Sequence, residues 1–211
     1  MPDTHYEIFA GLRDARVSYL VTGATALVLH GVPRITPDVD LAVDPNPANI
    51  ERLERLLAAW GYAETRGEAA AAEGAPVRRF RHPRSALDEI DVVLPPRADA
   101  ARLRAGSAVV SLVDLEIPIV GAADLISLKT ASGTPSDRDD AAGLKLLAAI
   151  REGDPGADGE TRRTQIRKFS RWSVPARLDW LLASARQRKG MSPEARPMTR
   201  NLRSRPWAGR R

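Results

Sequence analysis

Residues 18–43, SYLVTGATALVLHGVPRITPDVDLAV, set the framework of this chain. The run SYLVTG is short, apolar and ended by a glycine, which predicts a strand over residues 18–23. ATALVLH follows at once, and its apolar composition predicts a buried helix over residues 24–30 whose first N–H groups face the turn at Gly23. GVPRITP then breaks the helix, and DVDLAV predicts a second strand over residues 38–43. A glycine turn and a helix N-terminus are thus expected upstream of a strand that carries two aspartates.

Helices and strands alternate on both sides of this stretch. Helices are expected over residues 6–15, 47–61 and 96–106, and strands at VRRFR (77–81) and LDEIDVVL (87–94). Residues 108–120 have the pattern of a hairpin with its turn near residues 114–116, and two more helices are expected over residues 121–132 and 136–152. Residues 66–76 are rich in alanine and glycine, which predicts a mobile loop.

Charge divides the chain into two parts. The formal net charge is +5, yet residues 160–211 alone contain fifteen Lys and Arg against three acids, so the body before them is mildly acidic. We therefore expect a core domain over residues 1–152, a linker over residues 153–161, a basic helical extension over residues 162–189, and a disordered basic tail over residues 190–211.

Composition excludes several classes of site. Cysteine is absent, so disulfides and thiolate metal sites are excluded, and any metal must be held by carboxylates, imidazoles or carbonyls. No apolar run reaches the roughly 18 to 20 residues needed to span a bilayer, and the N-terminus lacks a basic region followed by an apolar stretch. These features predict a cytoplasmic protein with no membrane partner.

The aspartates of residues 38–43 carry the candidate chemistry. Asp38 and Asp40 are two apart in a strand, so both side chains leave the same face. Two like charges this close repel each other unless a cation lies between them, and Mg²⁺ prefers carboxylate oxygens together with the phosphates of a substrate. Asp91, in the apolar run of residues 90–93, is the expected third ligand. The alternative is a chance Asp-x-Asp pattern at the end of a strand.

Two segments resemble a known family. VTGATALVLHGVPRITPDVDLAV (residues 21–43) resembles the opening of the minimal nucleotidyltransferases, in particular the AbiEii/MNT-like branch of the polymerase-beta nucleotidyltransferase superfamily. IPIVGAADLISLKTASGTPSDRDDAAGLKLL (residues 117–147) is similar to that family's later stretch, in which a Leu-Ile-x-x-Lys helix precedes a helix that carries aspartates. The resemblance implies an α+β protein with the nucleotidyltransferase fold, a mixed β-sheet flanked by helices, and transfer of a nucleoside monophosphate to an acceptor.

The resemblance also implies a metal site. Asp38 and Asp40 match the family's ligands for Mg²⁺ or Mn²⁺, and Asp91 matches its third carboxylate. A reaction of this kind is a metal-assisted in-line displacement on a nucleoside triphosphate, in which Asp91 is the expected base.

A second group of residues is expected near the phosphates. Gly23 and Ala24 match the family's phosphate-binding pair and Lys129 a lysine near the phosphates, while Arg34 is a candidate by its residue type. The chain departs from the family at Ala24, where Gly or Ser is more usual, and at Thr134, where a basic residue is expected. The structural alternatives are a turn residue for Gly23, a snorkelling surface side chain for Lys129, and a loop cap for Arg34.

Other polar residues are expected to be structural. His30 follows an apolar helix, which is typical of a core histidine with a satisfied ring. The acids at the start of the helix over residues 136–152 favour its macrodipole: Asp137, Asp139 and Asp140.

The resemblance implies a metal-dependent nucleotidyltransferase that moves a nucleoside monophosphate to a hydroxyl of RNA or protein, and it allows a role as toxin of a toxin–antitoxin pair with an antitoxin protein as partner. The basic C-terminal region, where Trp172, Trp180 and Trp207 are interspersed with arginines, is a candidate RNA-binding surface. One alternative is a catalytically inactive module of the same fold that binds nucleic acid or protein, which Ala24 and Thr134 favour. Another is an antibiotic nucleotidyltransferase, which predicts a small acidic pocket for a cationic drug.

Overall fold

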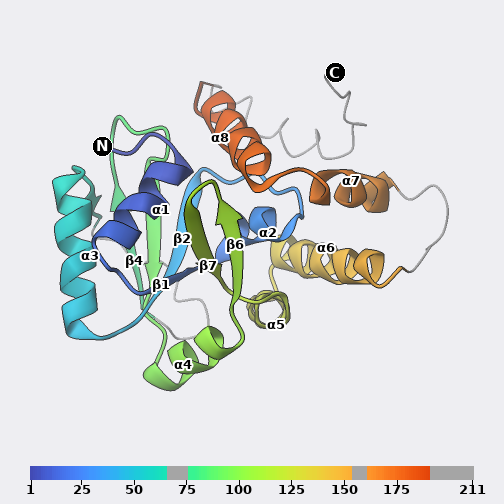
Figure 1. Cartoon of the computed structure of the whole chain (residues 1–211), viewed down its shortest axis with the longest axis horizontal. Coiled ribbons are helices and arrows are strands. Elements are labelled where there is room, and N and C mark those ends of the chain that lie inside the picture. The colour runs from blue at the N-terminus through green and yellow to red at the C-terminus, as the bar shows by residue number, and fades with distance from the viewer. Residues whose placement is uncertain (66–75, 154–160, 191–211) are drawn as a thin grey trace.

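The computed structural model describes residues 1–65, 76–153 and 161–190, with helices arranged around one sheet (Figure 1). Most of the loop predicted at residues 66–76, most of the linker predicted at residues 153–161, and the tail from residue 191 onward lie outside the described residues. Within the described residues, no helix is both long and apolar enough to cross a bilayer.

Seven strands form a mixed sheet in the order β3-β4-β5-β2-β1-β7-β6. The pairs β2–β5 and β1–β7 are parallel, and the other neighbours are antiparallel. The prediction of a mixed β-sheet flanked by helices is confirmed. The strands are β1 (Tyr19–Val21), β2 (Asp38–Val43), β3 (Ala63–Glu64), β4 (Val77–Arg81), β5 (Glu89–Val93), β6 (Ala108–Leu112) and β7 (Leu115–Ile119).

The first six helices lie close to the predicted ranges, and only their ends differ by a few residues, whereas the predicted helical extension over residues 162–189 consists of two helices, over residues 161–170 and 174–190. The helices are α1 (His5–Asp14), α2 (Gly23–His30), α3 (Pro47–Ala59), α4 (Arg97–Ala105), α5 (Ala122–Ser132), α6 (Pro135–Arg151), α7 (Thr161–Ser170) and α8 (Val174–Gly190). Several begin where the sequence supplies a cap: the side chains of Asn46 and Thr134 accept from the first-turn N–H groups of α3 and α6, and each cap is followed by a proline.

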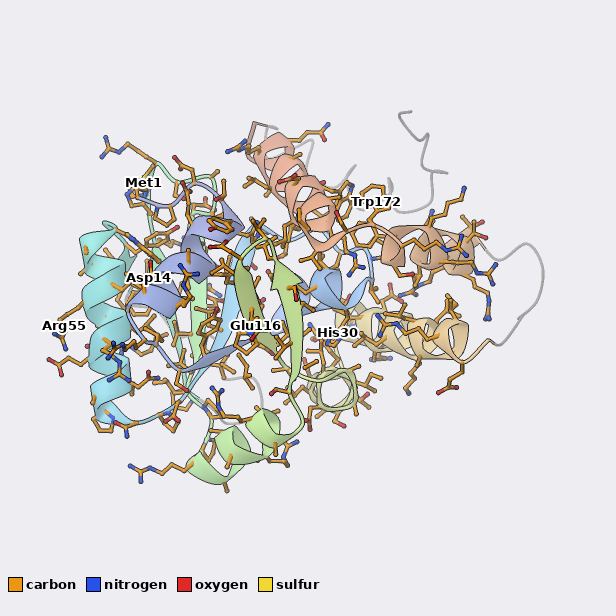
Figure 2. The ribbon with its side chains drawn as sticks, viewed as in Figure 1. Met1, Asp14, His30, Arg55, Glu116 and Trp172 are labelled. Atoms are coloured by element: carbon orange, nitrogen blue, oxygen red, sulfur yellow. The ribbon has the colours of Figure 1, made fainter. Side chains whose placement is uncertain are left out.

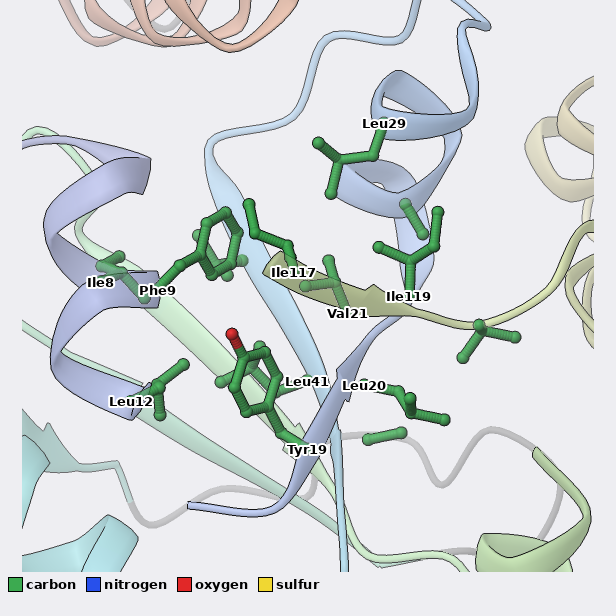
Figure 3. Close-up of a cluster of buried hydrophobic side chains, with 14 of the residues drawn as sticks. Ile8, Phe9, Leu12, Tyr19, Leu20, Val21, Leu29, Leu41, Ile117 and Ile119 are labelled. Atoms are coloured by element: carbon green, nitrogen blue, oxygen red, sulfur yellow. The ribbon is translucent and has the colours of Figure 1, made fainter. Parts of the chain in front are cut away.

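The alternation of side chains along β2 places apolar residues on one face of the sheet and aspartates on the other. Val39, Leu41 and Val43 are buried on one face, while Asp38 and Asp40 leave the other. Apolar side chains from α1, β1 and β7 fill the core around Leu41 (Figure 3): Ile8, Phe9, Leu12, Tyr19, Val21 and Ile117. The core therefore anchors β2 and leaves its aspartates on the opposite side.

The C-terminal helices pack on this domain. Helix α7 contacts α6, and α8 contacts α2. The ring of Phe169 lies 5.2 Å from that of Trp172 and 5.0 Å from that of Trp180, and this cluster packs against Val28 of α2. Figure 2 shows Trp172 at the junction of α7 and α8. Two of the three tryptophans considered for base stacking are thus engaged in internal packing, and Trp207 lies outside the described residues.

Candidate active site

The turn between β1 and α2 brings a helix N-terminus against β2. Gly23 has φ +56°, and a Cβ at this position would lie 2.0 Å from Oδ2 of Asp40. Glycine is therefore required both by the backbone conformation and by the close approach of the carboxylate. The backbone N–H of Ala24 donates to Asp40 Oδ2 at 3.2 Å, and the Thr25 hydroxyl donates to the carbonyl oxygen of Asp38 at 3.1 Å. The turn that was predicted to hold phosphate thus contacts the first two aspartates directly.

Asp40 occupies an electrostatically unfavourable position. Burial, together with the negative charges of Asp38 and Asp91, raises the pKa of Asp40 from 3.8 to about 7. The positive charge of Lys129 and the N–H of Ala24 offset only part of this rise in pKa. A cation between the carboxylates would relieve the repulsion, because it favours the ionised form of Asp40.

The register of three adjacent strands gathers charge on one face of the sheet. In the parallel pair β2–β5, Asp38 lies opposite Glu89 and Asp40 opposite Asp91. In the antiparallel pair β4–β5, residues 79 and 81 lie opposite residues 91 and 89. Because directly opposed residues share a face, four carboxylates and two guanidinium groups lie together. We call this set the charged face: Asp38, Asp40, Glu89, Asp91, Arg79 and Arg81.

Arg79 binds both carboxylate oxygens of Asp91, the third aspartate. Its Nε donates to Asp91 Oδ1 at 2.9 Å and its Nη2 to Asp91 Oδ2 at 2.8 Å. Arg79 Nε also lies 2.9 Å from Glu89 Oε1. Hydrogen bonding to Asp91 is the main cause that raises the pKa of Arg79 above its usual range. Asp91 lies beside Asp40, as predicted, but its nearest cation is a guanidinium.

The donor set fits a divalent metal ion in part. Asp38 and Asp40 offer oxygen ligands from one strand face, the pair that Mg²⁺ uses together with substrate phosphates. Both oxygens of Asp91 are bound by Arg79, and among the described residues no three His, Cys, Asp or Glu side chains form a group that could hold a metal. A two-carboxylate site therefore fits this arrangement, and the role of Asp91 as third ligand stays a prediction.

The two predicted phosphate-binding cations share a buried partner. Lys129 Nζ lies 2.6 Å from Asp137 Oδ1 and 3.3 Å from Asp140 Oδ2, while Arg34 Nε lies 3.2 Å from Asp140 Oδ1. Arg34 also donates to the Ser136 hydroxyl at 2.6 Å. The side chain of Lys129 is 17% exposed, so it is not the snorkelling surface lysine of the structural alternative. The start of α6 thus positions Arg34 and Lys129, and Lys129 is near enough to influence Asp40.

Thr134, at the position where a basic residue was expected, has a structural role. Its hydroxyl accepts from the N–H of Asp137 at 3.1 Å, as the N-cap of α6. Although burial opposes it, hydrogen bonds from Lys129, Ser132 and Thr134 lower the pKa of Asp137 to about 2. Asp137 is therefore a firmly ionised partner for Lys129.

Five charged residues of this region were not identified from the sequence as part of the site: Arg79, Arg81, Glu89, Asp137 and Asp140. For the first three, the signal was the alternation Arg-x-Arg in β4 beside Glu-x-Asp in β5, which places opposite charges on one face. Asp140 was grouped with helix-dipole acids, yet it is only 4% exposed, whereas the side chain of Asp139 is 63% exposed. His30 is a core histidine as predicted, because it is 7% exposed and its Nε2 lies 2.8 Å from the carbonyl oxygen of Val120.

Comparison with known proteins finds a similarity in structure but none in sequence. No protein-family model matches the chain, and no curated protein matches it in sequence. Among solved structures, the chain is similar to the crystal structure of the lincosamide antibiotic adenylyltransferase LnuA with lincomycin bound. The alignment has 16% sequence identity and a TM-score of 0.49, and it covers 66% of this chain and 93% of that chain.

Proposed function

We propose that the chain is a metal-dependent nucleotidyltransferase that moves a nucleoside monophosphate from a nucleoside triphosphate to an acceptor hydroxyl, with pyrophosphate as the leaving group. The observation that carries the proposal is the placement of Asp40. This carboxylate is half-buried beside two others, at a helix N-terminus, with its pKa raised to about 7. Burial beside like charges disfavours an ionised carboxylate, and carboxylates with pKa values perturbed in this way cluster at functional sites.

Each group of residues has a part in the proposed reaction. Asp38 and Asp40 would hold Mg²⁺ or Mn²⁺, and Asp91 is the third carboxylate, either as a further ligand and base or as the partner of Arg79. A divalent ion bound there would neutralise charge on the phosphates and lower the pKa of the acceptor hydroxyl. Arg34 and Lys129, oriented by Asp140, would bind the triphosphate.

The acceptor defines the competing proposals. RNA or protein is the acceptor if the chain is a toxin, and an antitoxin partner belongs to that proposal. A cationic antibiotic is the alternative acceptor, and the excess of carboxylates on the charged face is the feature that favours it. RNA binding by the extension would rest on its basic side chains, because Trp172 and Trp180 pack against Phe169.

The proposal is tested by incubating the purified full chain with each labelled triphosphate and Mg²⁺ or Mn²⁺. Bulk RNA, the protein itself and lincomycin serve as separate acceptors. We expect label transfer to one acceptor that requires the metal and is lost in Asp40→Asn. If no label is transferred from any triphosphate to any acceptor while RNA still binds in a salt-sensitive manner, the inactive binding module is the better description.

A further inference from the structure

Arg79 and Asp91 form a bidentate ion pair within the charged face. The guanidinium engages Asp91 side-on through Nε and Nη2, at 2.9 and 2.8 Å, which is the strong bidentate form of this pair. Glu89 supports it from the same strand, 2.9 Å from Nε. Two carboxylates thus fix one guanidinium, and both oxygens of Asp91 are used in doing so.

The fixed guanidinium still has donors to offer. A guanidinium carries five N–H groups, and the hydrogen bonds of Arg79 to Asp91 use Nε and Nη2. In the part of the chain that the structure describes, no hydrogen bond occupies Nη1 of Arg79, and its side chain is 34% exposed. The Nη1 group can therefore donate to an anionic oxygen without loss of the pair with Asp91.

The balance of charge favours one divalent ion. With all its groups ionised, the charged face has four carboxylates and two guanidinium groups, a net charge of −2. The neighbouring network pairs Arg34 and Lys129 with Asp137 and Asp140 and is neutral by itself. One divalent ion neutralises the charged face, whereas a second ion would leave an excess of positive charge.

From these observations we infer that Asp91 anchors Arg79 as a fixed positive charge for a substrate phosphate, and that Asp38 and Asp40 alone hold a single metal ion. Arg79 then supplies, from the protein, the charge that a second ion on Asp91 would supply. The inference deepens the proposed function and rests on it.

Metal binding separates the two roles of Asp91. We would titrate the full chain with Mn²⁺, without nucleotide, and measure free Mn²⁺ by electron paramagnetic resonance. The double variant Arg79→Gln with Asp91→Asn keeps the net charge, so its Kd should stay within about threefold of the parent, with one ion bound. Asp40→Asn should raise the Kd more than about tenfold.

Each contrary outcome has a distinct meaning. If the double variant loses as much Mn²⁺ affinity as Asp40→Asn, Asp91 is a metal ligand and the inference is overturned alone. If neither Asp38→Asn nor Asp40→Asn changes the Kd for Mn²⁺, the proposed metal site fails and the inference fails with it. Circular dichroism of every variant establishes that it is folded.

Phosphate binding tests the other half of the inference. Inorganic tripolyphosphate with Mg²⁺ is a suitable calorimetric probe, since it does not depend on which nucleotide is used. Arg79→Gln should weaken its binding about tenfold, and Arg79→Lys should recover only part, because lysine cannot form the bidentate pair. Arg55→Gln, at an exposed position of α3 outside the charged face, is the control with the same change in charge, and should stay within about twofold. Parent-like tripolyphosphate binding in Arg79→Gln would overturn the inference.

Discussion

The two ends of helix α2 contact side chains of opposite charge. Each end has a glycine with positive φ: Gly23 at +56° and Gly31 at +111°. At the N-terminal end the N–H of Ala24 meets the carboxylate of Asp40. At the C-terminal end Arg177 donates to the carbonyl oxygen of Leu29 at 2.8 Å, and Arg151 donates to that of His30, also at 2.8 Å. Both ends match the helix macrodipole, with negative charge at the start and positive charge at the end.

The difference lies in what surrounds each charge. Arg177 is 8% exposed and also donates to the carbonyl oxygens of Ser170 and Trp172, so its donors are used within the fold. Asp40 lies beside the like charges of Asp38 and Asp91, and it accepts one hydrogen bond from the N-terminus of the helix. We therefore expect changes at the C-terminal end to reduce stability, and changes at the N-terminal end to reduce ligand binding.

The largest expected effect is on activity, from Asp40→Asn. The substitution keeps an acceptor for the Ala24 N–H but removes the charge, so nucleotide transfer should fall at least about 100-fold. The melting temperature should stay the same or rise, because repulsion with Asp38 and Asp91 is removed. Asp99→Asn, an exposed acid of α4, is the control with the same change in charge. Full transfer activity in Asp40→Asn would remove this residue from the site.

Arg177→Ala should cause the largest loss of stability. It would leave three carbonyl oxygens at the α2–α7–α8 junction without their donor, which predicts a fall of about 3 kcal/mol in the free energy of unfolding. Urea denaturation measures the change, and Arg171→Ala, at an exposed position, should stay within about 0.5 kcal/mol of the parent. A similar small effect for Arg177→Ala would show that the C-terminal end of α2 is not fixed by this residue.

Alanine substitutions of Gly23 and Gly31 should both reduce stability, but only the first should weaken Mn²⁺ binding. Gly31→Ala should cost at least about 1 kcal/mol, since its φ is unfavourable and the new Cβ would lie 3.0 Å from Cβ of Ser170. Its Mn²⁺ affinity should not change. Gly23→Ala should cost a similar free energy and also weaken Mn²⁺ binding, because the new Cβ displaces Asp40.

Gly153→Ala is the control for backbone strain in both variants. Gly153 has φ +83°, and a Cβ there would have no heavy atom of the described residues within 4 Å. Equal Mn²⁺ affinity in Gly23→Ala and Gly31→Ala would contradict the expected difference between the two ends of α2.

The smallest expected effect is a dependence of stability on pH. In the metal-free protein the pKa of Asp40 is raised from 3.8 to about 7. Between these two values the folded chain keeps a proton that the unfolded chain has lost, so stability falls as pH rises, and the loss is complete above pH 7. From pH 4 to pH 8 with chelator, the free energy of unfolding of the parent should fall by more than that of Asp40→Asn. Parallel curves for the two proteins would show that Asp40 does not titrate in this range.

Local pattern was enough to predict most elements and the pair of metal-ligand candidates. The range of β2 and the side-by-side placement of Asp38 and Asp40 follow from the two-residue period of a strand, which is a property of neighbours in the chain. The turn at Gly23 and the satisfied core position of His30 were predicted in the same way.

Tertiary structure alone settled which charges meet. The pairing of Asp91 with Arg79 depends on the register between β4 and β5, and the shared hold of Arg34 and Lys129 on Asp140 depends on how α6 packs beside residues 31–37. The C-terminal end of α2 is completed by Arg177, 148 positions beyond Leu29, the residue whose carbonyl oxygen it binds. Periodicity predicts the face on which a side chain lies, but partners distant in the chain are selected by packing and by the cost of burying an unpaired charge.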